Sequence, residues 1–421
     1  METTAIKTSF PKYAAYKDSG VEWLGEIPEG WEIYPGLKFL FENKSKNTGM
    51  KRKTVLSLSF GNIRIKGEDE LTGLVPESFE TYQFVNKGDL IFRPTDLQND
   101  KVSLRSGISK YQGIITSAYL NLRFRPEANS RFYHYFFRAI DNNKIIYGLG
   151  SGLRQNISYQ DFRRFAFPFP PLPEQTAIAA FLDDKTAKID RVIAQKQQMI
   201  ALLKERKQII IQNAVTGKWS MVNGEWLMTP KDKMKHSGVE WIGEIPEGWE
   251  VKKLKFLLKI KNGQEYKHVV SEEGYPVIGS GGAFAFATDY LFDGEALLLG
   301  RKGTIDKPLY VNEKFWTVDT MFFAIVKKSY STKYLYFLAL TIPFKYYSTS
   351  TALPSMTQDD LNNHKIAIPS FIEQLEILNY LELELKKYDQ AITLQQTQIE
   401  KLKEYKATLI DSAVTGKIKV G

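Results

Sequence analysis

Basic side chains in turn-like or glycine-flanked settings are the residues of this sequence whose types best suit a chemical task, and that task is nucleic-acid binding. Arginine can form two hydrogen bonds with a guanine edge, small polar side chains can read other base edges, and glycine N–H groups can approach phosphate. The candidates for DNA contact are Lys51, Arg52, Lys53, Arg93, Arg105 and Arg154, followed by Ser280, Gly281, Arg301 and Lys302. For any one of them, a purely structural or solvated role is the alternative.

Side-chain patterns that would support catalysis are missing from the sequence. The four histidines do not have metal-ligand spacing, and the chain has no cysteine, no phosphate-loop lysine motif and no Asn-Pro-Pro-aromatic tetrad. Segment 148–152 is glycine-rich like a nucleotide-binding loop, but neither a helix opening nor an acidic residue for a ribose follows it. We therefore expect no catalytic residue, no metal and no cofactor in this chain.

The positive charge is concentrated in particular segments of the 421 residues, whose formal net charge is +9. Residues 31–172 contain 21 basic and 13 acidic residues, whereas residues 249–371 contain 15 and 12. Eleven of the first 21 basic residues are arginine, against one of the later 15. A basic surplus suits phosphate neutralisation, although a solvated basic face is the alternative. The difference in arginine usage predicts that the two segments bind different DNA sequences.

The composition also bears on where the protein works. An absence of cysteine fits a reducing compartment, and no apolar run approaches the roughly 20 residues that a membrane span needs. The N-terminal residues have no apolar core of a signal peptide. We expect a cytoplasmic protein with no membrane contact.

The elements that must position the basic candidates come in two copies. Residues 19–32 and 237–250 are identical except for Leu24 against Ile242, an offset of 218. The sequence Ala-Val-Thr-Gly-Lys at 214–218 recurs at 413–417, an offset of 199, so the middle of the second copy is shorter. The chain is therefore an internal repeat whose ends are copied and whose middles differ.

The end of each copy predicts a long helix with a heptad seam. Apolar residues recur at heptad spacing in the first helix, and the same positions 199 residues later are again apolar. Polar residues at 196 and 207 interrupt the seam and match polar residues at 395 and 406. Two such helices can pair with each other, whereas a helix packed on its own domain is the alternative. The predicted seam consists of Leu182, Ile189, Ile193, Ile200, Leu203 and Ile210 with Leu381, Tyr388, Ile392, Ile399, Leu402 and Leu409.

The middles predict mixed α/β domains, because short β-rich runs are bounded by turn residues and a helical pattern follows near the end of each middle. We divide the chain into a first recognition domain at 1–172 with motif 19–32, and a first long helix at 173–218. A linker and second domain at 219–371 contain motif 237–250, and a second long helix with the C-terminal tail occupies 372–421.

These repeated motifs resemble the specificity subunit of type I restriction-modification systems over essentially the whole chain. The resemblance rests on the Gly-x-x-Trp-Ile/Leu-Gly-Glu-Ile-Pro-x-Gly-Trp openings at 20–31 and 238–249. It also rests on the Glu-Gln helix starts at 174–175 and 373–374 and on both Ala-Val-Thr-Gly-Lys ends. It implies a mixed α/β fold with two target-recognition domains joined by an antiparallel coiled coil of two long helices, with pseudo-two-fold symmetry. The second copy departs from the pattern at Pro354-Ser-Met-Thr, where the first has Gln155-Asn-Ile-Ser.

The same resemblance implies a function and partners. Each domain would bind half of a split double-stranded DNA target, with no catalysis in this chain. Two modification subunits would bind S-adenosylmethionine and methylate adenine, and restriction subunits would cut DNA. The alternatives are a coiled-coil scaffold without catalytic activity and a DNA-binding protein outside restriction-modification.

Overall fold

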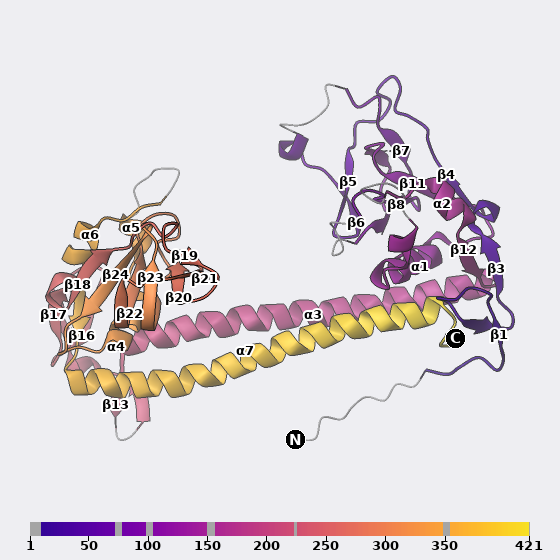
Figure 1. Cartoon of the computed structure of the whole chain (residues 1–421). Coiled ribbons are helices and arrows are strands. Elements are labelled where there is room, and N and C mark those ends of the chain that lie inside the picture. Colours follow the sequence, from indigo (N-terminus) through magenta and orange to yellow (C-terminus); the bar gives the residue numbers. More distant parts are fainter. Residues whose placement is uncertain are drawn as a thin grey trace. The chain divides into compact units, whose positions relative to one another are not determined.

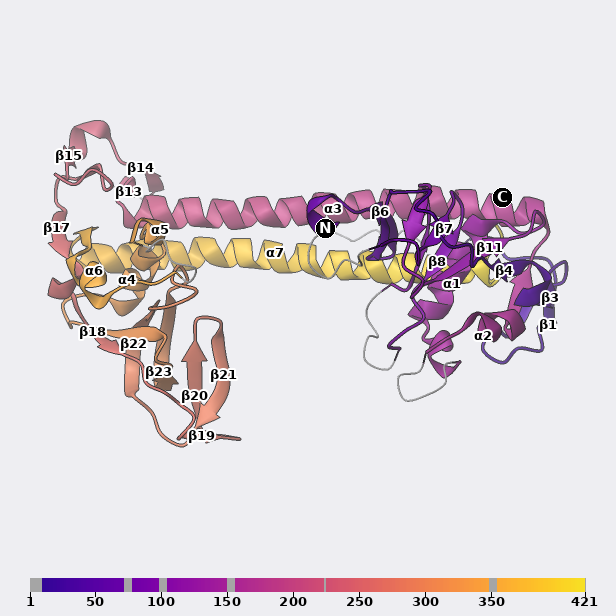
Figure 2. The same cartoon turned by 90° about the horizontal axis from the view of Figure 1, so that it is seen from above.

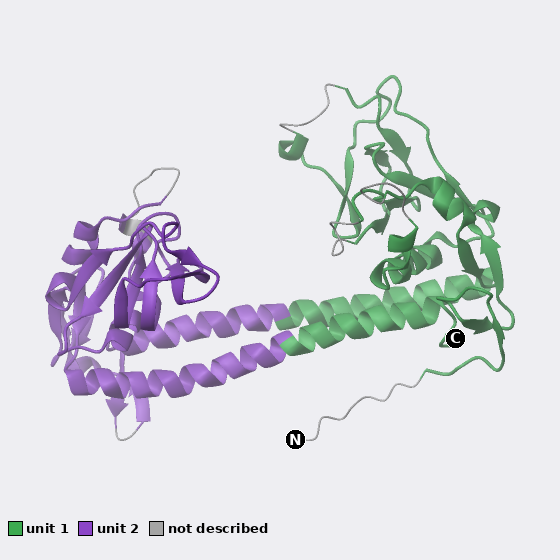
Figure 3. Cartoon of the chain, in the orientation of Figure 1, with its two compact units in different colours: residues 1–196, 397–421 green, residues 197–396 purple. Residues whose placement is uncertain are grey.

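A computed structural model describes residues 10–71, 78–97, 104–149, 156–222, 225–347 and 354–420. The chain forms two compact units (Figure 3). Unit 1 is made from two separate stretches of sequence, and unit 2 from one continuous stretch. Unit 1 comprises residues 1–196 and 397–421, and unit 2 comprises residues 197–396. Each unit therefore contains the first part of one long helix and the last part of the other.

The two long helices are α3 (Leu172–Val215) and α7 (Phe371–Val414), each of 44 residues (Figures 1 and 2). In unit 1 the first turns of α3 share a core with the last turns of α7, and unit 2 shows the converse. The helices are therefore antiparallel, as the repeat predicts. Asp190 accepts from Lys406 at 2.6 Å in unit 1, and the symmetry-related Asp389 accepts from Lys207 in unit 2.

The residues of the predicted heptad seam lie away from solvent in the structure. The side chains of Leu182, Ile210, Leu381 and Leu409 are buried, and every other predicted seam residue is buried or half-buried. The polar interruptions lie in the same interface, where Lys196 donates to Gln398. A polar group in a seam of this kind fixes the register of the helices.

In unit 1, short strands and two short helices precede α3. The strands are β1 (Tyr16–Asp18), β2 (Glu26–Pro28), β3 (Glu32–Pro35), β4 (Leu40–Glu42), β5 (Leu56–Ser59), β6 (Asn62–Ile65), β7 (Gln83–Val85), β8 (Leu90–Phe92), β9 (Ser106–Ile108), β10 (Gly113–Ile115), β11 (Leu120–Phe124) and β12 (Ala166–Phe169). The helices are α1 (Ser130–Asn142) and α2 (Tyr159–Arg164). The central sheet is antiparallel in the order β4-β11-β8-β9.

In unit 2, the main sheet contains longer strands, of up to nine residues. The strands of this unit are β13 (Trp219–Val222), β14 (Glu225–Met228), β15 (Met234–His236), β16 (Glu244–Pro246), β17 (Glu250–Lys253), β18 (Leu258–Asn262), β19 (Val270–Ser271), β20 (Tyr275–Gly279), β21 (Gly282–Ala287), β22 (Phe292–Gly300), β23 (Leu309–Thr317), β24 (Met321–Val326) and β25 (Lys365–Ile368). The helices besides α3 and α7 are α4 (Thr332–Ala339), α5 (Phe344–Tyr347) and α6 (Gln358–Asn363). The main sheet has the order β18-β24-β22-β23-β20-β21-β19.

Both units use the same frame. The sheet order β4-β11-β8-β9 of unit 1 matches β18-β24-β22-β23 of unit 2, strand for strand in chain order. Strand β12 pairs with β3 as β25 pairs with β17, and α2 and α6 each begin with a capping box. The middles of the two copies therefore share a mixed α/β fold although their sequences differ.

The repeated residues account for how this frame closes on the helices. Trp31 and Trp249 are buried in the cores of their units. A Cβ on Gly416 would lie 2.3 Å from Pro28 in unit 1, and a Cβ on Gly217 would lie 2.4 Å from Pro246 in unit 2. Since both glycines also have positive φ, only glycine fits at either helix end.

The glutamine of the repeated Glu-Gln pair has the same structural role at both helix starts. The side-chain oxygen of Gln175 accepts from the Asn129 N–H at 2.7 Å, and its amide donates to the Pro170 carbonyl at 2.8 Å. Gln374 makes the same two bonds with Ser331 and Pro369, at 2.9 and 3.1 Å. Each glutamine thus joins the start of a long helix to the cap of α1 or α4.

Candidate nucleic-acid interface

Two hairpins occupy the same place in the two units and carry different tips. Hairpin β5–β6 is joined to β10 through a parallel bridge between Val55 and Ile114. Hairpin β20–β21 is joined to β23 through parallel pairing of Val277 with Trp316. The two-residue tips are Phe60-Gly61 in unit 1 and Ser280-Gly281 in unit 2. Two predicted candidates, Ser280 and Gly281, therefore form a hairpin tip.

The loops that follow β8 and β22 are also equivalent. Arg93 and Arg301 come directly after these strands, and their N–H groups donate to the Arg105 and Thr320 carbonyls at 2.8 and 2.9 Å. The segment before α2 bonds to the first loop through Ile157, and the segment before α6 bonds to the second through Met356. Arg93 and Arg301 are half-buried.

The second of these loops keeps basic groups accessible. The Arg301 guanidinium donates to the Asp319 carbonyl at 3.2 Å. This bond orients the side chain and uses one of its several N–H groups. Lys302 beside it is exposed. Both side chains can approach a phosphate without a change in the backbone.

Arg105 corrects one expectation, because its side chain is 0% exposed. Its guanidinium donates to the carbonyl oxygens of Thr95 and Asp96 at 2.7 and 3.0 Å. Its backbone N–H donates to the Asp141 carboxylate at 3.0 Å, and burial raises the pKa of that carboxyl. Arg105 therefore holds the loop after β8 in shape and is not accessible to DNA in this structure.

The basic triplet before β5 is divided between the surface and the fold. Lys51 and Lys53 are exposed, whereas the Arg52 guanidinium donates to the Val85 carbonyl at 3.0 Å and to the Asn86 side chain at 3.1 Å. Arg52 therefore ties the approach to β5 to the end of β7. Arg154 lies outside the described residues, as does most of the glycine-rich segment 148–152.

The comparisons with known proteins agree with this architecture. The family model of the type I restriction modification DNA specificity domain matches the chain twice, at residues 44–202 and 246–404. The chain belongs to this family. It is a type I specificity subunit with two copies of the specificity domain.

Individual relatives have low sequence identity to this chain and cover different shares of it. The putative type I restriction enzyme MjaX specificity subunit of Methanocaldococcus jannaschii is 23% identical and covers 94% of this chain and 96% of its own length. The EcoKI specificity subunit of Escherichia coli K12 is 27% identical over 60% of this chain and 54% of its own. A solved chain from a study of complex assembly and conformational transition of the type I R-M system has a TM-score of 0.66 at 16% identity. It covers 92% of this chain and 98% of its own length, which supports the fold.

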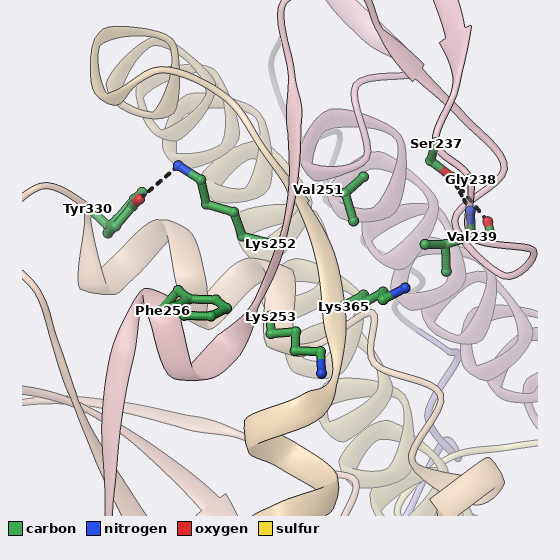
Figure 4. A pocket seen from close by; sticks show the side chains of 9 residues that line it. All are labelled: Ser237, Gly238, Val239, Val251, Lys252, Lys253, Phe256, Tyr330 and Lys365. Carbon is green, nitrogen blue, oxygen red and sulfur yellow. Dashed lines mark hydrogen bonds between the residues drawn. The ribbon is translucent and has the colours of Figure 1, made fainter.

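A pocket of about 610 Å³ in unit 2 of the specificity subunit has three lysines among its lining residues, Lys252, Lys253 and Lys365 (Figure 4). Lys252 donates to the Tyr330 hydroxyl at 3.3 Å and pairs with Glu250 at 2.7 Å, and the bond to Glu250 raises the pKa of Lys252. Lys253 donates to the Asn363 side chain at 3.1 Å. The corresponding positions of the first copy are not lysine, so this pocket distinguishes unit 2.

The described part of the specificity subunit has neither a metal-binding cluster nor a membrane-spanning helix. Among those residues, no group of three or more His, Asp or Glu side chains is arranged to hold a metal ion. No helix in the described ranges is long and apolar enough to cross a membrane.

Proposed function

We propose that this specificity subunit recognises a split double-stranded DNA sequence, with unit 1 binding one half-site and unit 2 the other. The observation that carries the proposal is that the two units share one fold but expose different side chains at equivalent places. The hairpin tips are Phe60-Gly61 and Ser280-Gly281, and basic residues follow β8 and β22 in both units. Base contacts specify sequence whereas phosphate contacts position the protein, so different tips on one frame suit different half-sites.

The paired helices α3 and α7 would act as a spacer between the half-sites. They are continuous over 44 residues each, and a helix rises 1.5 Å per residue. An antiparallel pair of equivalent helices would relate the two copies by a pseudo-dyad, a symmetry that duplex DNA shares. The number of unread base pairs between the half-sites would then depend on helix length.

The chain would act without catalysis of its own, and its partners would supply the chemistry. Two modification subunits would bind S-adenosylmethionine and methylate adenine within the target, and restriction subunits would cut DNA. Support for two copies of one partner comes from the repeated openings and helix ends, which form the same local structures in each unit. The expected compartment is the cytoplasm.

The decisive experiment is methylation mapping in cells that express the full chain with its modification subunit. We expect methylated adenines in a motif of two specified halves separated by unspecified bases. Cells with the modification subunit alone are the control and should show no such motif. An uninterrupted motif, or an identical methylation pattern without the specificity subunit, would overturn the proposal.

A further inference from the structure

Phe60 is the most exposed large apolar side chain in the described part of the protein, at 90%. It occupies the first position of the β5–β6 turn with φ +47°, and Gly61 follows with φ +72°. Turns of this kind favour Asn-Gly, because a bulky side chain is strained at positive φ. A tip that served only to reverse the chain would therefore not select phenylalanine, and strain of this sort concentrates at functional positions.

The turn is also held rigidly from below. Arg138 of α1 is largely buried, and its guanidinium donates to the Gly61 carbonyl at 2.7 Å. A Cβ on Gly61 would lie 2.7 Å from that guanidinium and 2.9 Å from Leu104. On the other side, the Asn62 amide donates to the Phe60 carbonyl at 3.2 Å. The hairpin thus presents an aromatic ring to solvent on a fixed backbone.

We propose that Phe60 is a wedge that inserts between neighbouring base pairs of the half-site bound by unit 1. This inference rests on the proposed function. Apolar side chains that enter a base step unstack it and kink the duplex, most easily at TA and CA/TG steps. Unit 1 would therefore favour a half-site that contains such a step, because a flexible step costs less energy to unstack when the tip inserts.

DNA fits this tip better than a partner protein does. The hairpin lies in the segment with 21 basic and 13 acidic residues. A surface for two identical partner subunits would be repeated, as the openings and the helix ends are. The equivalent tip in unit 2 is instead Ser280-Gly281, which has no apolar side chain to insert.

The test compares the full chain with Phe60→Asn and Phe60→Trp. Asparagine tolerates positive φ, so Phe60→Asn removes the ring while preserving the turn. The probe is a duplex with the motif found by methylation mapping, in which 2-aminopurine replaces one adenine of the first half-site at a time. Fluorescence of 2-aminopurine increases when its base is unstacked.

We expect the wild type to increase the fluorescence at one step severalfold, and Phe60→Trp to retain this signal. Phe60→Asn should lose the signal and bind the duplex roughly 5- to 150-fold more weakly, the range for one base–aromatic stack. Its melting temperature should equal or exceed that of the wild type. If Phe60→Asn retains signal and affinity, or weakens only assembly with the modification subunit, the wedge is rejected and DNA recognition stands. If the wild type binds no duplex, the proposed function itself is rejected.

Discussion

In unit 2, hairpin β20–β21 and the loop after β22 adjoin long continuous strands, whereas the equivalent hairpin and loop of unit 1 adjoin short ones. Strands β22 and β23 each run for nine residues. The matching paths in unit 1 are divided into β7 with β8 and β9 with β10, and Gly88 has φ +87° at the first division. Unit 1 uses arginine side chains at these breaks, because Arg105 bonds to the Thr95 carbonyl in the loop after β8 and Arg52 bonds to the Val85 carbonyl at the end of β7. The same frame can therefore support either an extended sheet or clamped loops.

The residues that do not differ between the units have a different task. The buried tryptophans, the helix-terminal glycines and the glutamines at the helix starts make equivalent contacts in both copies. Every one of these contacts closes a recognition domain onto the helix pair. The repeated residues therefore attach each domain to the helix pair, whereas the residues that differ determine which side chains each domain exposes.

The largest expected effect comes from changing what the units share, the length of the helix pair. Removing residues 193–199 and 392–398 takes one heptad from each helix at matched positions and shortens the pair by about 10 Å. We expect the methylated motif to keep both half-sites and to change its spacer by about three base pairs, at about 3.4 Å each.

Deleting the heptad from only one helix is the control for this experiment. It would place the apolar seam of one helix out of step with the other, so we expect a large loss of thermal stability and no methylation. A double deletion that methylates the original motif at unaltered spacing would show that the helices are not the spacer.

A second test asks whether fully buried and half-buried positions of the seam contribute equally to stability. Leu182 and Leu381 are symmetry-related and fully buried, so replacing either with alanine should lower the free energy of unfolding by about 2–5 kcal/mol. Leu203 and Leu402 are half-buried, and their alanine variants should cost about 1–2 kcal/mol. Denaturant unfolding of all four variants measures this order, and equal costs would contradict the burial pattern.

A third test contrasts Arg105 and Arg301, which are both predicted from the sequence to contact DNA. Arg105→Ala leaves buried carbonyls without donors, so we expect a loss of about 2–4 kcal/mol in the unfolding free energy. Arg301→Ala removes one bond at a half-buried position and should change stability by less than about 0.5 kcal/mol. It should instead weaken DNA binding and reduce the salt dependence by about one ion. The opposite assignment would mean that Arg105 contacts DNA.

The sequence predicted the frame better than the accessible residues. The long helices were expected at 173–218 and 372–421 and lie at Leu172–Val215 and Phe371–Val414, because a repeated heptad pattern is a strong local signal. The accessibility of Arg105 and the importance of Phe60 could not be predicted in the same way. The loop carbonyls that surround the Arg105 side chain come together only when the chain folds. Phe60 lies at the hairpin tip only because of the register in which β5 pairs with β6. A glycine after an ordinary apolar residue was the one available signal for that turn.

The smallest effect tests a single exchange between the copies. Trp241 stacks on His364 in unit 2 with an interplanar angle of 18°, and Trp23 stacks on Phe165 at the equivalent place in unit 1 with an angle of 22°. Burial lowers the pKa of His364 from 6.5 to about 4. A histidine whose pKa is lower in the folded state binds its proton preferentially in the unfolded state. Its stabilising contribution is therefore complete above pH 6.5 and is lost as the pH falls towards 4.

The variant His364→Phe gives unit 2 the residue that unit 1 already has. We expect the wild type to lose about 1–3 kcal/mol more than the variant between pH 7 and pH 4, measured by denaturant unfolding at each pH. His134 in unit 1 is the matched control, since burial lowers its pKa to about 3 and its contribution remains in both proteins. Loss of the Tyr347 hydroxyl bond to His364 lowers the variant's stability at every pH and leaves the difference in slope intact. Parallel pH curves for wild type and variant would show that the pKa of His364 is the same in the folded and unfolded states, which would contradict this prediction.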